Sequence, residues 1–370
     1  MAEAPPPPPA HPAKAPVVVV TDIGRDVDDT IALLTAAGSG AFDVVGVVTT
    51  GGSGEKRCAS CAHWLKSAGL GDVPMCIGDA DEDYEDASAL GCSTDPEWTA
   101  PENVRRDPEA FFVELAEKHV GELVIVCLGP LLPLSKAVDA DKDGALWKIK
   151  GIGLQGSVEE VMVDSGEVDE ETGEPKMVGT GKLAPLEEAF NFRQHMESAR
   201  NVMDKLSGFV RFRVCSKHAA YSVKMLLEDL VFLGPNAGEA VAEQTALFRM
   251  NNRPKFMECF ALKSEFEGRT ELYDKDDWYN YTTHACTPYD PLVLMSFSAS
   301  WMFDFKQIGT LHLYAGVSQE ETNVRKPAEF VKLITASCTS AVEAGKAVAA
   351  AAAAAAAAEA EAAPADAPAP

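Results

Sequence analysis

The amino-acid sequence predicts an α/β fold, with a single large domain, a mainly parallel central sheet and helices on both faces. Apolar β-branched runs alternate with segments of helical character, and this order is typical of βαβ units with parallel strands. The first such run, Val17–Val20, is four consecutive valines, as expected of a strand buried on both faces. A composition of 46% hydrophobic and 24% charged residues is that of a globular protein with a sizeable core.

The predicted elements follow one another in strand–helix order. After Val17–Val20, a helix is predicted to begin at Asp28 or Asp29 and to end at Gly38, because carboxylates favour helix starts and glycine favours helix ends. Asp107 is predicted to cap a later helix that begins with a proline. The other predicted strands are Val44–Thr49, Val73–Ile77, Leu123–Leu128 and Ile149–Leu154, and the other predicted helices are Glu55–Ala68 and Pro108–His119.

Both ends of the chain are of low complexity. Residues 1–16 are predicted to be a disordered, proline-rich tail, residues 17–344 the folded domain, and residues 345–370 an Ala/Pro-rich tail with helical propensity. Within the domain, residues 157–182 are predicted to be an exposed acidic loop, because eight acidic and no basic residues lie between Glu159 and Glu174. A solvated loop is the favoured interpretation, and an active-site lid is the alternative.

The charge of the chain excludes several partners. The formal net charge is 32 − 57 = −25, and such a surface repels nucleic-acid phosphates and anionic membranes. We find no apolar run as long as a membrane span and no apolar signal-peptide centre near the N-terminus. Nine cysteines, an odd number, indicate free thiols in a reducing compartment. We therefore expect a cytoplasmic protein with a small-molecule partner.

The sharpest chemical feature is an acidic cluster directly after the first strand. Asp22, Asp26, Asp28 and Asp29 lie between Val17–Val20 and the predicted helix. Ligands of parallel α/β sheets bind at the carboxyl ends of strands. Carboxylates this close repel one another unless a cation, hydrogen-bond donors or solvent stabilises them, and oxygen-rich clusters suit Ca²⁺ or Mg²⁺. The alternative is a capped helix with exposed acids.

Three rival motifs are weaker. Gly151–Gly156 matches G-x-G-x-x-G, but an acidic segment follows where a dinucleotide site requires a helix. Asp139–Gly144 begins like an EF-hand loop, but its twelfth position is Lys150 rather than glutamate, which favours a turn at a helix end. Cys58 and Cys61 have no second pair at zinc-site spacing, so we interpret them as buried thiols.

The acidic cluster resembles the first motif of the inosine-uridine-type nucleoside hydrolases, in the variant D-x-G-x-D-x-D-D. Five more segments resemble motifs of that family in the same order, from about Val17 to about Ala341. They are GVVTTGGS (Gly46–Ser53), CLGPLLPLSKA (Cys127–Ala137), KGIGLQG (Lys150–Gly156), EEAFNF (Glu187–Phe192) and YDPLVL (Tyr289–Leu294). The ordered set is more specific than any one motif.

The resemblance implies hydrolysis of the N-glycosidic bond of a ribonucleoside, a step of purine or pyrimidine nucleoside catabolism. It implies a Ca²⁺ ion at the pocket floor that holds the ribose hydroxyls and the attacking water. Its ligands would be the carboxylates of Asp22, Asp29 and Asp290 and the backbone carbonyl of Leu132. Because relatives commonly form dimers or tetramers, it also implies a homo-oligomer.

The resemblance also assigns roles to residues that contact water and substrate. Asp22 would be the general base for the attacking water, because a carboxylate can accept its proton. Asp28 and Asn191 would bind ribose hydroxyls, and Ser53 stands where the family has a ribose-binding asparagine. Tyr289 stands where better-known members have a histidine that helps to protonate the departing base.

Four positions depart from the family pattern, namely Val20, Ser53, Ala189 and Tyr289. Val20 replaces the leading aspartate of the first motif, and Ala189 replaces a glutamate, although Glu188 is adjacent. A tyrosine with a pKa near 10 donates a hydrogen bond but is a poor acid at neutral pH. The alternative function is therefore a non-catalytic member that binds a metal and a riboside.

Overall fold

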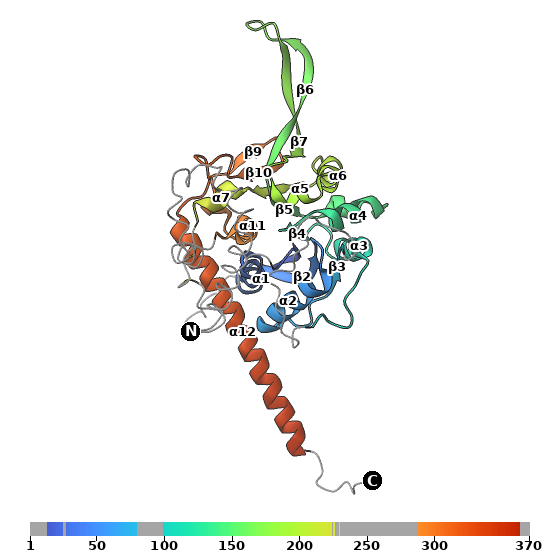
Figure 1. The fold of residues 1–370 in the computed structure, drawn as a ribbon, viewed down its shortest axis with the longest axis vertical. Helices are drawn as coiled ribbons and strands as arrows, with labels where there is room; N and C mark the ends of the chain where they lie inside the picture. The colour runs from blue at the N-terminus through green and yellow to red at the C-terminus, as the bar shows by residue number, and fades with distance from the viewer. Residues whose placement is uncertain are drawn as a thin grey trace, which may run out of the picture.

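The valine run forms the middle of strand β1 (Ala15–Thr21), the centre of the fold in the computed structural model (Figure 1). The structure describes residues 13–24, 27–79, 99–223, 225, 229 and 287–362. All four valines of the run have no exposed surface. Val17 and Val19 face one hydrophobic core, and Val18 and Val20 face a second core on the other side of the sheet. The sheet is therefore covered on both faces, as the uninterrupted apolar run predicted.

Eight strands form the central sheet in the order β3-β2-β1-β4-β5-β8-β10-β9. Every neighbouring pair is parallel except β10 and β9. Besides β1, the strands are β2 (Phe42–Thr49), β3 (Met75–Ile77), β4 (Val124–Cys127), β5 (Gly151–Gln155), β8 (Phe212–Cys215), β9 (Lys306–Ile308) and β10 (His312–Ala315).

Helices pack on each face of this sheet. The core that contains Val17 also contains residues of α1 (Asp28–Gly38), α2 (Gly54–Ser67), α11 (Tyr289–Ser298) and α12 (Pro327–Ala362). The opposite core contains residues of α3 (Pro108–Lys118), α4 (Leu132–Ala140) and α6 (Met196–Leu206). The shorter described elements are α5 (Phe190–Gln194), α7 (Lys217–Tyr221), and the 3₁₀ turns η1 (Leu146–Lys148) and η4 (Ser300–Met302). The predicted fold class is confirmed.

The rival motifs take the forms that the sequence favoured. Gly151–Gly156 runs from β5 into another strand rather than into a helix. Asp141 ends α4 and accepts hydrogen bonds from the two backbone N–H groups of Ala145 and Leu146, as in a turn. Both thiols of the C-x-x-C pair are buried.

The predicted cap of α3 is wrong in its details. Asp107 precedes the helix but makes no side-chain hydrogen bond to it. Its carboxylate instead accepts hydrogen bonds from Nε and Nη2 of Arg105, at 2.9 and 2.6 Å. A guanidinium two residues away competes successfully with the helix N–H groups, because a bidentate charged pair is stronger than a neutral cap bond.

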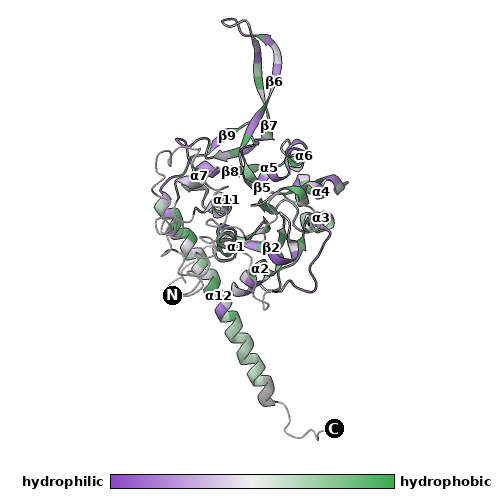
Figure 2. Ribbon diagram, in the orientation of Figure 1, coloured by the Kyte–Doolittle hydropathy of each residue, from purple (hydrophilic) through white to green (hydrophobic). Residues whose placement is uncertain are grey.

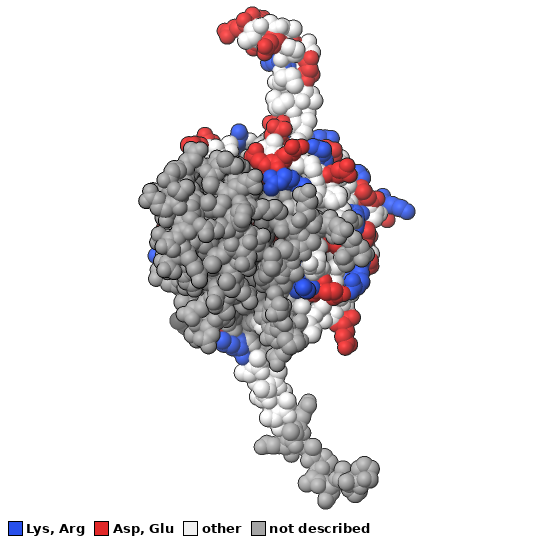
Figure 3. All heavy atoms as spheres, in the orientation of Figure 1, with Lys and Arg blue, Asp and Glu red and all other residues white. Residues whose placement is uncertain are grey.

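The acidic segment is an ordered β-hairpin rather than the predicted loop. Strands β6 (Val158–Val168) and β7 (Pro175–Pro185) pair antiparallel as a separate two-stranded sheet. Figure 1 shows this hairpin projecting from the domain, and Figure 3 shows acidic side chains at its tip and near its base. The predicted exposure is correct. The strand pairing was missed because acidic residues interrupt the apolar alternation of β6, and glycines and lysines interrupt that of β7.

The alanine run continues a core helix. The predicted boundary between residues 344 and 345 falls inside α12, whose first turns pack in the core and whose alanine-rich end projects from the domain (Figure 1). At Gly345 a Cβ atom would lie 2.0 Å from the Ser67 carbonyl oxygen, so only glycine permits this contact with α2. Figure 2 shows the projecting end as apolar.

By length and composition α12 could cross a membrane, contrary to the expectation from sequence, although core helices of water-soluble proteins pass the same test.

Candidate active site

The strand order places a ligand site at the carboxyl ends of β1 and β4. From β1 the sheet continues through β2 and β3 on one side and through β4 and β5 on the other. The chain therefore reverses its direction of winding between β1 and β4, and such switch points open a crevice for ligands in α/β sheets. Asp22 directly follows β1, and the Leu128–Gly129 segment directly follows β4.

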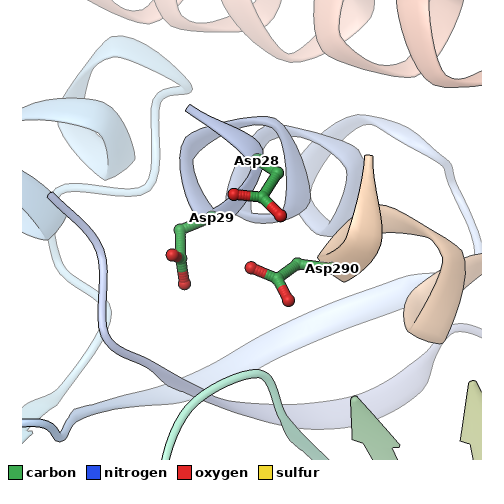
Figure 4. A group of neighbouring side chains, drawn as sticks. All are labelled: Asp28, Asp29 and Asp290. Carbon is green, nitrogen blue, oxygen red and sulfur yellow. The ribbon is translucent and has the colours of Figure 1, made fainter. Parts of the chain in front are cut away.

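Three buried carboxylates meet near the carboxyl end of β1. Asp28, Asp29 and Asp290 each offer a carboxylate oxygen, and these oxygens lie within 4.8 Å of one another. Each residue is only 5% exposed. Figure 4 shows Asp28 and Asp29 on the first turn of α1 and Asp290 facing them from the start of α11. The structure thus brings together residues about 260 positions apart in the sequence.

The surroundings of this carboxylate trio favour negative charge and a cation. Its members lie in the first turns of two helices, whose N-termini carry partial positive charge. Three buried carboxylates at this spacing still repel one another strongly, and an all-oxygen donor set suits a hard divalent cation. The residues present therefore fit a Ca²⁺ or Mg²⁺ ion.

Thr21 orients one member of the trio. Its hydroxyl, at the end of β1, donates a hydrogen bond to Oδ1 of Asp29. The same hydroxyl oxygen accepts the N–H of Ile23 at 3.2 Å, so the turn after β1 and the carboxylate are held by one atom. Sequence analysis missed this role, because a threonine at a strand end has no distinguishing pattern.

Asp22 is not part of the trio in the described part of the chain, although it was predicted to be a metal ligand and the base. Its carboxylate lies against two glycines. A Cβ atom on Gly129 would lie 2.8 Å from Oδ1 of Asp22, and one on Gly51 would lie 3.0 Å from its Cβ. Asp28, predicted only as a ribose ligand, takes the third place. Leu132 opens α4 and remains a predicted carbonyl ligand.

Asn191 lies at the carboxyl ends of β4 and β5. Its Nδ2 group donates to the Leu128 carbonyl and, at 2.9 Å, to Oε1 of Gln155. Both bonds come from Nδ2, which turns the carbonyl oxygen Oδ1 to the other side of the amide. Asn191 is buried, with 6% of its surface exposed, and its predicted ribose contact remains a prediction.

Ser53 precedes α2 with left-handed backbone torsions, at a φ of 51°. It is half-buried, and its predicted ribose contact is likewise untested. Two other departures from the family pattern are structural. Val20 faces the core on the α3 side of the sheet, and Ala189 is buried while the adjacent Glu188 is exposed.

Tyr289 begins α11 immediately before Asp290 and is half-buried. Its ring meets that of Tyr221 edge to face, with centroids 6.2 Å apart, and Tyr221 meets His218 in the same way at 5.7 Å. The sequence analysis did not single out α7, which carries both of these residues, because Arg211 and Arg213 interrupt the apolar run of the strand before it. Asp26 lies outside the described residues, and so do the aromatic candidates for stacking on a base, Trp278, Tyr279 and Tyr281. His284, six residues before Asp290 and the alternative candidate for protonating the base, also lies outside them.

Two further charged residues escaped the sequence analysis. Arg57 on α2 is 2% exposed, and Asp79 after β3 is 3% exposed. Asp79 follows a predicted strand at the same sheet edge as Asp22, so the pattern that singled out Asp22 applies to it as well. Arg57 lies among other polar residues of its helix and carries no such signal.

Comparison with known proteins gives one family match. The model of the family described as inosine-uridine preferring nucleoside hydrolase matches residues 17–361. No curated protein gives a significant sequence match.

Three similar solved structures share the fold. The type III effector protein XopQ complexed with adenosine diphosphate ribose is 17% identical, with a TM-score of 0.68, and the match covers 89% of this chain and 93% of that one. The plant nucleoside hydrolase PpNRh1 is 17% identical, with a TM-score of 0.56 and coverage of 88% and 99%. A purine-preferring ribonucleoside hydrolase from Gardnerella vaginalis is 13% identical, with a TM-score of 0.58 and coverage of 88% and 99%.

Since the family model spans nearly the whole described domain, this chain belongs to the inosine-uridine preferring nucleoside hydrolase family.

Proposed function

We propose that the protein hydrolyses the N-glycosidic bond of a ribonucleoside or a related N-riboside, with Ca²⁺ as its cofactor. Family and fold support riboside hydrolysis in general. The observation that carries the proposal is the carboxylate trio, buried on two helix N-termini beside the switch point of the sheet.

Asp28, Asp29 and Asp290 would hold the ion, with Asp22 and the Leu132 carbonyl as the further ligands that the sequence predicts. When bound, the cation would favour deprotonation of a water and would hold the sugar hydroxyls. Oxygen-only donors favour Ca²⁺ or Mg²⁺ over softer metals, and we propose Ca²⁺ from the resemblance of the motifs.

The chain's own residues would carry the remaining chemistry. Asp22 would accept the proton of the attacking water, as a carboxylate base directly after β1. Asn191, Asp28 and Ser53 would orient the ribose through its hydroxyls. As the bond to the base breaks, the sugar gains oxocarbenium character, and the buried carboxylates would stabilise that positive charge.

Protonation of the leaving base is the step for which these residues are least suited. Tyr289 can donate a hydrogen bond to the departing base but transfers a proton reluctantly at pH 7. We therefore expect faster cleavage of a nitrophenyl riboside than of inosine. Tyr289→Phe should cost less kcat/KM on the activated substrate than on inosine. If His284 supplies the proton instead, His284→Ala will depress inosine cleavage sharply while Tyr289→Phe is nearly silent. Robust inosine turnover by both variants would contradict the leaving-group argument.

The function is tested by screening the purified protein against a panel of nucleosides for release of free sugar, with and without a chelator. Sugar release that stops on chelation and returns with Ca²⁺ is the expected result. Turnover that is indifferent to chelation would overturn the metal-dependent mechanism.

A non-catalytic riboside-binding protein is the second candidate. The observation that favours it is the fold similarity to XopQ, whose structure holds adenosine diphosphate ribose, together with the substitutions at Val20, Ala189 and Tyr289. Ca²⁺ and riboside binding by calorimetry, without sugar release from any substrate of the panel, would favour this candidate over the enzyme.

We further propose that the protein acts in the cytoplasm as a homodimer or homotetramer, with no nucleic-acid or membrane partner. Its net charge of −25 supports the absence of those two partners. Sedimentation equilibrium would measure the oligomeric state, and a monomer at all concentrations would contradict the proposal.

A further inference from the structure

The buried guanidinium of Arg57 joins the two loops that border the site. Nη1 donates to the carbonyls of Asp22 and, at 2.8 Å, of Ile23, in the loop after β1. Nε donates to the Gly52 carbonyl at 2.8 Å, and Nη2 donates to the Gly51 carbonyl at 3.1 Å, in the loop after β2. One planar group thus binds four backbone carbonyls of two loops, which a lysine ammonium cannot reproduce.

Asp79 holds the same loop from the other side. Its Oδ2 accepts the N–H of Gly51 at 2.9 Å and the hydroxyl of Thr50 at 2.7 Å. The Thr50 hydroxyl also lies 3.1 Å from the Pro130 carbonyl, in the turn after β4. Gly51 is therefore bound at its N–H by a buried anion and at its carbonyl by a buried cation.

The loop contains one residue in a disfavoured backbone conformation. Gly51, Gly52 and Ser53 have φ values of 80°, 73° and 51°, which makes three consecutive left-handed residues. Serine is disfavoured in this region, and such conformations persist only where surrounding contacts determine them. Arg57 and Asp79 supply such contacts to Gly51 and Gly52, the two residues before Ser53.

The position of Asp22 depends on this loop. A Cβ on Gly51 would lie 3.0 Å from Cβ of Asp22 and 3.7 Å from both Oδ2 of Asp22 and Nη2 of Arg57. The Asp22 side chain therefore packs on Gly51, while its carbonyl is bound by Arg57. A shift of the loop by a few tenths of an ångström moves the carboxylate.

We propose that Arg57 and Asp79 are positioning residues that together set the place of the Asp22 carboxylate beside the carboxylate trio. The inference rests on the proposed function, in which Asp22 is the base and a ligand. Neither residue touches the reacting atoms, and both act through the backbone of the Gly51 loop.

The test measures Ca²⁺ affinity by isothermal titration calorimetry and, separately, kcat and KM on the riboside that the panel identifies. Arg57→Met should weaken Ca²⁺ binding about tenfold or more and lower kcat more than it raises KM, since a misplaced base costs rate rather than binding. Arg57→Lys should fall between this variant and the wild type. Asp79→Asn keeps an acceptor oxygen for Gly51 and should retain far more affinity than Asp79→Ala.

The matched control is Arg213, a half-buried arginine on β8 whose Nη1 donates to the Ser296 carbonyl. Arg213→Met should lower the unfolding temperature but leave Ca²⁺ affinity within about twofold, because its bond does not reach the Gly51 loop. Arg57 variants that behave like this control, less stable but with wild-type affinity and kcat, would overturn the proposal.

A double-mutant cycle isolates the route through Asp22. In an Asp22→Asn background, Arg57→Met should have little further effect on Ca²⁺ affinity, because the side chain that it positions no longer carries the charge. Fully additive effects would overturn the proposal. If the wild-type protein binds Ca²⁺ without turnover, the proposed hydrolysis is wrong, and the Ca²⁺ affinities of the variants alone decide this inference. If it binds no Ca²⁺, both fail.

Discussion

Acidic residues crowd together at two places in this chain, the carboxylate trio and the β6–β7 hairpin. The trio consists of three side chains, each 5% exposed, on two helix N-termini. The hairpin carries eight acidic residues between Glu159 and Glu174, nearly all exposed, on a ribbon that projects into solvent. The hairpin has the longer acidic run, but among the residues that the structure describes only the trio brings three carboxylate oxygens within 4.8 Å of one another.

The difference indicates that burial of the carboxylates, rather than their number, distinguishes a candidate metal site from an exposed acidic segment. In the hairpin, water screens the charges, and local contacts satisfy them. The pKa of Asp169 is lowered by the N–H groups of Thr172 and Glu171, and Lys176 pairs with Glu167 at 3.1 Å. Exposed pairs of this kind contribute little to stability. In the trio, low solvent access preserves the repulsion, and a cation is the effective way to relieve it.

The largest effect is expected at Asp22, the half-buried aspartate that we propose as the general base. Asp22→Asn should reduce kcat by about 10²–10⁴, as loss of a general base typically does. Asp26→Asn should be far milder, since the resemblance assigns Asp26 no role. Steady-state rates of sugar release measure both variants, and equal, small losses would show that the acidic motif is only structural.

The next effect contrasts the trio with the hairpin directly. Asp290→Asn should weaken Ca²⁺ binding by more than the roughly 10–100-fold that loss of a residue supporting a metal ligand costs. The matched control neutralises three hairpin acids at once, in Asp164→Asn/Glu170→Gln/Glu171→Gln, and should change the calorimetric affinity less than twofold. A comparable loss in the triple variant would mean that overall charge, rather than the trio, attracts the ion.

A smaller effect tests repulsion within the trio. In the chelated protein, Asp28→Asn should raise the free energy of unfolding by about 1 kcal/mol or more, because like charges 4 Å apart repel by about 4 kcal/mol at an effective dielectric constant of 20. With Ca²⁺ present, the same variant should be less stable than the wild type. Urea unfolding in each condition measures the reversal of sign. If Asp28→Asn destabilises both forms, the trio is not electrostatically strained.

The smallest effect concerns the base of the hairpin, where a buried histidine joins it to the central sheet. Nδ1 of His312 accepts the N–H of Phe212 at 3.2 Å, and Nε2 lies 3.0 Å from the Gly181 carbonyl. These two contacts require the neutral Nε2–H form. Burial lowers the pKa of His312 from 6.5, although its hydrogen bonds to backbone carbonyls and the charge of Glu160 oppose this.

Because the unfolded chain binds this proton more readily, the stabilising contribution of neutral His312 is complete above about pH 6.5 and is lost as the pH falls below it. His312→Gln should flatten the dependence of unfolding free energy on pH between about 7 and 5, by at most the 1.4 kcal/mol per pH unit of one proton. Denaturant titrations at a series of pH values measure that slope, and an unchanged slope would contradict the pKa shift.

Much of the fold was predictable from the sequence because its elements are local. Val17–Val20, the Asp28–Gly38 helix and the strand after Phe42 were placed within a few residues, since apolar runs and helix ends depend on neighbours along the chain. Strands β8 and β10 were missed, because a charged or polar side chain lies within each short apolar run, Arg213 in β8 and His312 in β10. The hairpin was missed for a different reason, because the many acidic residues of β6 favour an exposed loop over a paired strand.

The sequence by itself determined the fold class, the acidic motif after β1 and the order of motifs that led to the family. Only the tertiary structure decided which acids meet. Asp290 reaches Asp28 and Asp29 because α11 packs beside α1, whereas Asp22, six residues before the start of α1, packs on Gly51 and Gly129. Arg57 and Asp79 likewise gain their partners only when β1, β2 and β3 lie side by side. Spacing along a chain encodes which face of an element is buried, but strand order and helix packing set which faces come together.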